Sequence, residues 1–70
     1  MRERKINKLL GKKVQRLRKT LGYTQEGFAE HIGISRTHMG HIEQGRKSPS
    51  LELIDKIAKT LKVKVSNLFS

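Results

Sequence analysis

The chain has 70 residues and a mass of 8.0 kDa, which suffices for one small domain and excludes an enzyme whose active site lies between two lobes. Apolar residues make up 34% of it and cysteine is absent, so no disulfide compensates for a thin core, and we expect a reducing compartment, the cytoplasm. We find no apolar run near the roughly 20 residues that span a bilayer and no apolar stretch typical of a secretory signal. The formal net charge of +10 predicts a polyanionic partner, either nucleic acid or an anionic membrane surface.

Basic residues are concentrated at the start of the chain. Residues 1–19 hold nine basic side chains and one acidic side chain, a net charge of +8, whereas residues 20–70 have a net charge of +2. By itself, such a run is as typical of a solvated helix face with a frayed end as of a binding surface. We divide the chain into a mobile, basic N-terminal arm over residues 1–8 and one domain over residues 9–70.

The spacing of apolar residues predicts the first helix of this domain. Leu10, Val14, Leu17 and Leu21 recur at intervals of four, three and four residues, which places them in one stripe along a helix. The opposite face carries lysine and arginine side chains, which we expect to face solvent. Gly22 follows the stripe and ends the helix.

Two short helices are predicted on either side of Gly33. Thr24 is a suitable N-cap for a helix over residues 25–32, and Ser35 is one for a helix that reaches about Gln44. Gly33 is free to take the left-handed conformation that reverses the chain between them. The residues expected to face the core from these helices are Phe28, Ala29, Ile32, Met39 and Ile42.

Gly45 ends the third helix and starts a short basic loop, and Ser50 caps a fourth helix. A last helical turn at residues 66–69 is expected to fold its apolar pair, Leu68 and Phe69, back over the bundle. The core face of the fourth helix is predicted to hold Leu51, Ile54, Ile57, Ala58 and Leu61. The sequence therefore predicts an all-α fold, a compact bundle of five short helices without a sheet.

The two helices around Gly33 resemble the helix-turn-helix of the Cro and phage-repressor family. Gln25 opens the first of them, Ala29 is small where the helices cross, and Met39 and Ile42 anchor the second. Flanking landmarks extend the resemblance over residues 9–70: a Thr-Gln opening, Ser-Arg-Thr before the third helix, Ile-Glu-x-Gly at its end and Pro-Ser-Leu before the fourth.

The resemblance implies a lambda-repressor-like DNA-binding domain and a sequence-specific transcriptional regulator, most often a repressor in this family. It implies a homodimer on a palindromic operator, with the third helix of each copy, residues 35–44, in the major groove. We expect the dimer contact in the C-terminal segment, around Val63, Asn67 and Phe69. No ligand-binding part is evident, and we expect no cofactor.

Several polar residues match positions that contact DNA in this family. Arg36 is the strongest candidate for reading a base, because its guanidinium can donate two hydrogen bonds to guanine; binding to phosphate alone, or pairing with an acid of the bundle, remains open. Thr37 can contact a base or a phosphate, and a role only in starting the helix is equally open. Gln25 and the loop after the third helix, including Ser48, would bind phosphates. The predicted DNA-binding residues are Gln25, Ser35, Arg36, Thr37, His38, His41, Gln44, Arg46 and Lys47.

Arg18 and Glu43 match positions that form an ion pair in similar proteins, so we expect them to be structural. His38 and His41 lie three residues apart on one helix, but without a cysteine or a free neighbouring acid we expect no metal site. No arrangement of nucleophile and base and no phosphate-binding glycine loop predicts an enzyme.

Two other functions remain open. The chain can be a protein-interaction module of the antitoxin or immunity type, with a further protein partner, if it has a second apolar surface beyond the dimer contact. A binder of membrane surfaces or of RNA without sequence preference would expose aromatic side chains, and Tyr23 alone is a poor candidate.

Overall fold

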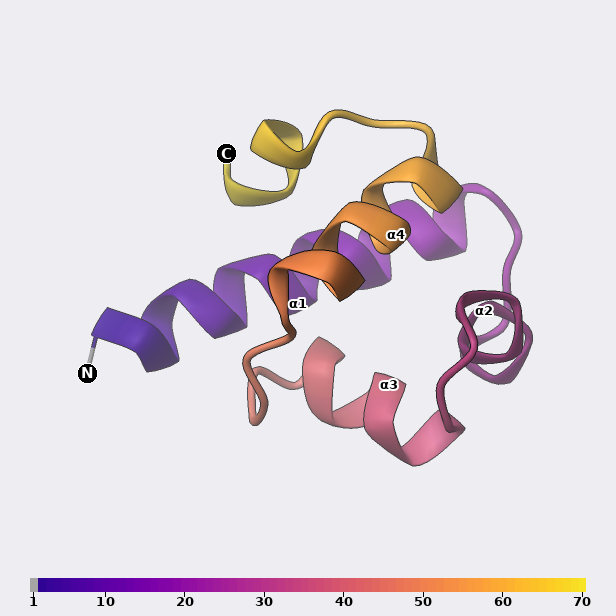
Figure 1. Ribbon diagram of the computed structural model, residues 1–70, viewed down its shortest axis with the longest axis horizontal. Coiled ribbons are helices and arrows are strands. Elements are labelled where there is room, and N and C mark those ends of the chain that lie inside the picture. The colour runs from indigo at the N-terminus through magenta and orange to yellow at the C-terminus, as the bar shows by residue number, and fades with distance from the viewer. Residues whose placement is uncertain (1) are drawn as a thin grey trace.

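Four α-helices and one 3-10 helix account for most of residues 2–70, which are the residues that the computed structural model describes, with side chains from Lys5 onward (Figure 1). The elements are α1 (Arg2–Thr20), α2 (Gln25–Ile32), α3 (Arg36–Glu43), α4 (Leu51–Leu61) and η1 (Val65–Phe69). The all-α class is confirmed, and the fifth element is a 3-10 helix rather than an α-helix. None of the described helices is long and apolar enough to cross a membrane.

Hydroxyl side chains cap the starts of α2, α3 and α4, as predicted. The side-chain oxygen of Thr24 accepts a hydrogen bond from the N–H of Gly27 at 3.0 Å, and that of Ser35 accepts one from His38 at 3.0 Å. Ser50 does the same for α4 at 3.1 Å. Each cap satisfies a backbone donor that has no partner within its helix, so three of the helix starts follow directly from local sequence.

Gly33 makes the tight turn between α2 and α3. Its φ of +94° lies in the left-handed region, and its N–H donates to the carbonyl of Ala29 at 2.8 Å. The N–H of Ile34 donates to the same carbonyl at 3.0 Å, which closes the end of α2. The turn is therefore short enough for α2 and α3 to pack against each other.

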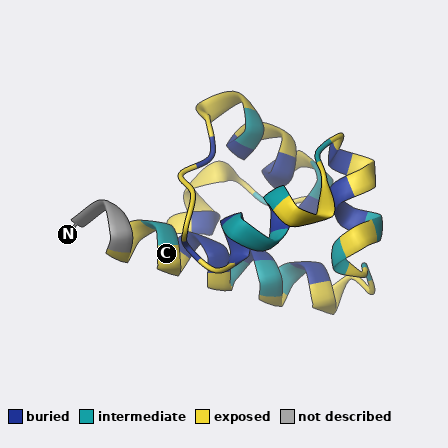
Figure 2. Cartoon of the chain, turned by 90° about the horizontal axis from the view of Figure 1, so that it is seen from below, coloured by how far each residue is buried: buried dark blue, intermediate teal, exposed yellow. Residues whose placement is uncertain are grey.

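The core is formed by all five elements: α3 packs against both α1 and α2, α4 against α1 and α2, and η1 against α1 and α4. Figure 2 shows the buried positions gathered on the inward faces of the helices. The buried apolar residues are Leu10, Val14, Phe28, Ala29, Ile32, Met39, Ile42, Ile54, Ile57, Ala58, Leu61 and Leu68. Twelve of the sixteen predicted core residues are among them, and Leu17 is partly buried against the core.

Three residues expected in the core are exposed. Leu21 is 47% exposed, Leu51 84% and Phe69 44%. Each lies at or just beyond an end of its helix, where neighbouring elements cover the helical stripe less completely. Leu68 alone carries the apolar contact that we assigned to the last turn.

The first helix begins earlier than expected. We predicted a mobile arm over residues 1–8, but residues 2–8 belong to α1 and continue into the domain without a break; Met1 lies outside the described residues. No proline or glycine precedes Gly11, so nothing in this stretch interrupts a helix. The side chain of Lys8 also packs against the turn at Gly45, which ties this part of α1 to the domain.

Gly11 is the point at which α1 crosses the end of α3. A Cβ placed on Gly11 would lie 2.8 Å from the carbonyl carbon of Glu43 and against the carbonyl oxygen of Ile42. Both of these atoms belong to backbone, which cannot move aside as a flexible side chain would. The two helices therefore approach this closely only because residue 11 has no side chain.

We expect Gly11→Ala to lower the free energy of unfolding by about 1–3 kcal/mol, because the added methyl group forces α1 away from the end of α3. Gly40→Ala is the matched control. A Cβ at Gly40 would meet only the Gln25 amide, at 3.8 Å, so the usual preference of helices for alanine should stabilise that variant by about 0.5–1 kcal/mol. Urea unfolding of both variants checks this, and equal stabilisation by both substitutions would contradict the close crossing.

Candidate nucleic-acid interface

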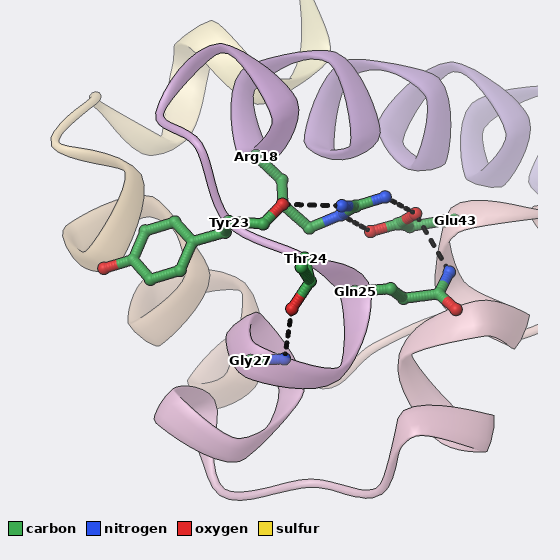
Figure 3. Close-up of polar contacts among 6 residues, drawn as sticks. All are labelled: Arg18, Tyr23, Thr24, Gln25, Gly27 and Glu43. Atoms are coloured by element: carbon green, nitrogen blue, oxygen red, sulfur yellow. Dashed lines mark hydrogen bonds and ion pairs between the residues drawn. The ribbon is translucent and has the colours of Figure 1, made fainter.

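An almost fully buried ion pair joins α1 to the end of α3 (Figure 3). The Arg18 guanidinium donates from Nε to Glu43 Oε2 at 2.7 Å and from Nη2 to Glu43 Oε1 at 3.0 Å. A third bond runs from Nη1 to the backbone carbonyl of Tyr23 at 2.9 Å. Arg18 is 5% exposed and Glu43 6%, so the pair predicted from the sequence is present and is shielded from solvent. The fork of Arg18 thus ties together α1, the turn before α2, and α3.

Gln25 extends this network from the start of α2. Its side-chain Nε2 donates to Glu43 Oε1 at 3.2 Å, and the residue is half-buried. We predicted that Gln25 contacts a phosphate, and the structure directs one of its two amide hydrogens to Glu43 instead. The other amide hydrogen and the free backbone N–H groups at the start of α2 remain suited to an anion.

The outer side of α3 lines an open surface hollow together with the ends of its neighbours. The lining residues are Gln25, Arg36, Thr37, Gly40, His41, Gln44 and Arg46. Six of these seven are residues that we singled out from the sequence, and they come from α2, from α3 and from the loop that follows it. The structure therefore brings residues 21 positions apart in the chain onto one surface.

Helix α3 has an inner and an outer side, as a groove-reading helix requires. Met39 and Ile42 are completely buried, whereas Arg36 and Thr37 are exposed and His41 is half-buried. The apolar contacts hold the helix rigidly against the bundle while its polar side chains face out. An exposed rod of this width fits the major groove of B-form DNA.

The remaining predicted residues lie outside this hollow. Ser35 uses one acceptor position of its hydroxyl oxygen to cap α3, and its O–H can still donate to another partner. Lys47 is exposed in the loop, and His38 is half-buried on α3. Among the described side chains, no group of three His, Cys, Asp or Glu residues is arranged to hold a metal ion, and His38 and His41 gain no third ligand.

The charge of this surface is strongly positive. Arg36, Arg46 and Lys47 are exposed, and the acid nearest to them in sequence, Glu43, is already paired with Arg18. Glu43 therefore does not repel a polyanion from the hollow.

Sequence reasoning missed three contributors to this geometry. Gly11 sets the distance between α1 and α3, the carbonyl of Tyr23 holds the third nitrogen of Arg18, and Lys8 lies against Gly45. The first had a usable signal, because a glycine inside an otherwise unbroken amphipathic helix often marks a close backbone approach. The bond from Arg18 to Tyr23 spans only five residues, across the turn at Gly22, and the contact of Lys8 with Gly45 joins distant segments; neither left a local pattern in the sequence.

Comparison with known proteins identifies relatives that are helix-turn-helix regulators. The model of the helix-turn-helix family matches residues 14–68. The chain is 41% identical over 58 residues to the uncharacterised HTH-type transcriptional regulator YazB of Bacillus subtilis, covering 83% of this chain and 84% of YazB. It is 39% identical over 61 residues to the control protein C.MunI of Mycoplasma sp., covering 86% and 82% of the two chains. The crystal structure of the restriction-modification controller protein C.AhdI from Aeromonas hydrophila superposes with a TM-score of 0.84 at 32% identity, over 90% of this chain and 96% of that one.

We expect Glu43→Gln to destabilise the fold by about 3–5 kcal/mol, because it leaves the buried guanidinium of Arg18 without a counter-charge. Chemical unfolding monitored by circular dichroism measures the loss. The double variant Arg18→Met with Glu43→Met removes both charges and should recover most of the stability, since no unpaired charge then remains buried. If the single and double variants were equally unstable, packing rather than the ion pair would hold α1 to α3.

Proposed function

Because the chain belongs to the helix-turn-helix family of Cro and phage-repressor type transcriptional regulators, we propose that it represses transcription as a homodimer bound to a near-palindromic DNA operator. The observation that carries this proposal is the outer side of α3, which presents exposed polar side chains next to a basic loop. C.MunI and C.AhdI, which are named as a control protein and a restriction-modification controller protein, are similar over most of their length. That similarity supports a role in transcriptional control.

In this proposal Arg36 reads a base and the residues around it set the register. Arg36 is exposed at the first position of α3 and forms no ion pair with a described acid, so its guanidinium is available to the O6 and N7 atoms of guanine. Thr37 and His41 lie on the same surface and face neighbouring bases or the sugar-phosphate backbone. The hydrogen-bonding fork of arginine makes Arg36 the main determinant of sequence.

Phosphate contacts come from the two edges of the hollow. Gln25 at the start of α2 and Gln44 and Arg46 after α3 line the hollow, and Lys47 follows them in the exposed loop. Contacts on both sides would orient α3 in the groove without distinguishing one sequence from another.

The dimer would place two α3 helices in successive major grooves, about 34 Å apart. We assign the contact between copies to the C-terminal segment, where Asn67 and Phe69 are exposed and Val63 is half-buried in the core. Phe69 lines the same surface hollow as Leu9 of α1, which is 61% exposed, so exposed apolar side chains of both segments face one hollow. Exposed apolar side chains that adjoin one another favour association.

Selection of bound duplexes from a random pool tests the proposal, and we expect an inverted repeat with half-sites one helical turn apart. Arg36→Lys keeps the charge but loses the fork, so it should relax the preference at one base position per half-site, at a cost of about 1–3 kcal/mol. Lys47→Ala should instead weaken binding to all sequences alike. Uniform enrichment of the whole pool by the unmodified protein would refute sequence-specific regulation.

Phe69→Ser should weaken self-association, so that the variant binds single half-sites as a monomer. Sedimentation with and without the operator measures the oligomeric state. Leu21→Ser is the control, since Leu21 is exposed to a similar degree, 47% against 44%, but lies outside the C-terminal segment. An unchanged dimer in Phe69→Ser would place the contact elsewhere.

A further inference from the structure

The N-terminal half of α1 lies directly against the basic loop that follows α3. A Cβ placed on Gly45 would be 2.7 Å from Lys8 Cγ and 2.9 Å from Lys8 Cα. The aliphatic stem of Lys8 therefore rests on the backbone at Gly45, where only a glycine leaves room for it. Gly45 has a φ of +76°, which also favours glycine at this position.

The turn that receives Lys8 is itself held in place. The N–H of Gly45 donates to the carbonyl of Ile42 at 3.1 Å, and the N–H of Arg46 donates to the carbonyl of His41 at 2.8 Å. These two bonds close the end of α3 and determine where the loop leaves it. Lys8, Arg46 and α3 thus occupy defined positions relative to one another.

Among the side chains that the structure describes, the cations on the two sides of this contact have no acidic partner. Among the described side chains, the ion pairs are Arg18–Glu43 and Lys59–Asp55, and neither involves Lys8, Arg46 or Lys47. From Lys5 to Thr20, α1 contains no acidic residue. Lys5 lies one turn before Lys8, about 4.5 Å along the helix axis, and it is exposed as well. Cations placed so close together repel one another unless an anion lies between them.

We infer that Lys8 of α1 binds a DNA phosphate adjacent to those bound by Arg46 and Lys47, so that the two segments form one continuous phosphate-binding surface. This inference rests on the proposed DNA-binding function and adds a site to it. The site is fixed by the packing of Lys8 on Gly45 and by the helix, whereas a mobile arm would lose conformational freedom on binding. A fixed site also determines which phosphate is bound.

The test measures the affinity for the selected duplex as a function of salt concentration for Lys8→Met and Lys59→Met. Methionine at position 8 keeps an unbranched stem on Gly45 but removes the charge. Lys59→Met is the control, because it changes the net charge by the same amount on α4. We expect the slope of log affinity against log salt to decrease by about 0.9 for Lys8→Met and to stay unchanged for Lys59→Met. The loss caused by Lys8→Met should then be about 3.5-fold larger at 50 mM than at 200 mM salt.

Lys8→Arg should retain the slope, and ethylation of one phosphate next to those bound by the loop should interfere with binding of the unmodified protein but not of Lys8→Met. A wild-type slope for Lys8→Met, together with a reduced slope for Lys47→Met, would overturn the inference and leave the proposed function intact. An equal loss of affinity at every salt concentration would also overturn it, because it would show that Lys8 acts by packing alone. If the unmodified protein selected no duplex, the proposed function would fail and this site with it.

Discussion

The bonds that Arg18 makes with Glu43 and Tyr23 hold α1, the turn before α2 and the end of α3 together. One guanidinium donates to three acceptors that come from two different segments, and Gln25 donates a third hydrogen bond to the same carboxylate. Burial of two charges is costly, and it is sustained here by the paired geometry and by the additional hydrogen bonds. No buried side-chain polar atom of the described residues lacks a partner, so this network is complete. Because Glu43 is the last residue of α3, the network sets the position of that helix.

The same network has an electrostatic effect on the neighbouring surface. An acid at the end of α3 would repel DNA if it faced solvent, and its pairing with Arg18 removes that repulsion. The exposed charges around the hollow are then all positive, and the exposed acids of α2, Glu26 and Glu30, lie outside it. One buried pair thereby serves both the packing of α1 against α3 and the charge of the interface.

Two glycines allow α1 to lie close to α3 and to the loop. Gly11 lets the helix backbones cross, and Gly45 makes room for the stem of Lys8. In both cases the space that a side chain would occupy is taken up by another segment of the chain rather than by solvent. The basic first half of α1 is consequently continuous with the domain and contacts it at Lys8, although its charge and its position at the start of the chain favour a loose arm.

The helix starts at Thr24, Ser35 and Ser50, the turn at Gly33 and most of the core could be predicted from the amino-acid sequence, because capping, left-handed backbone and apolar periodicity are local properties. The sequence also indicated the Arg18–Glu43 pair and the residues of the hollow, through the resemblance to a family with known landmarks. Only the tertiary structure decided that Leu21, Leu51 and Phe69 are exposed, that residues 2–8 continue α1, and that Gln25 bonds to Glu43. These features depend on which segment lies beside which, and contacts between residues far apart in the chain leave no periodic signal in the sequence.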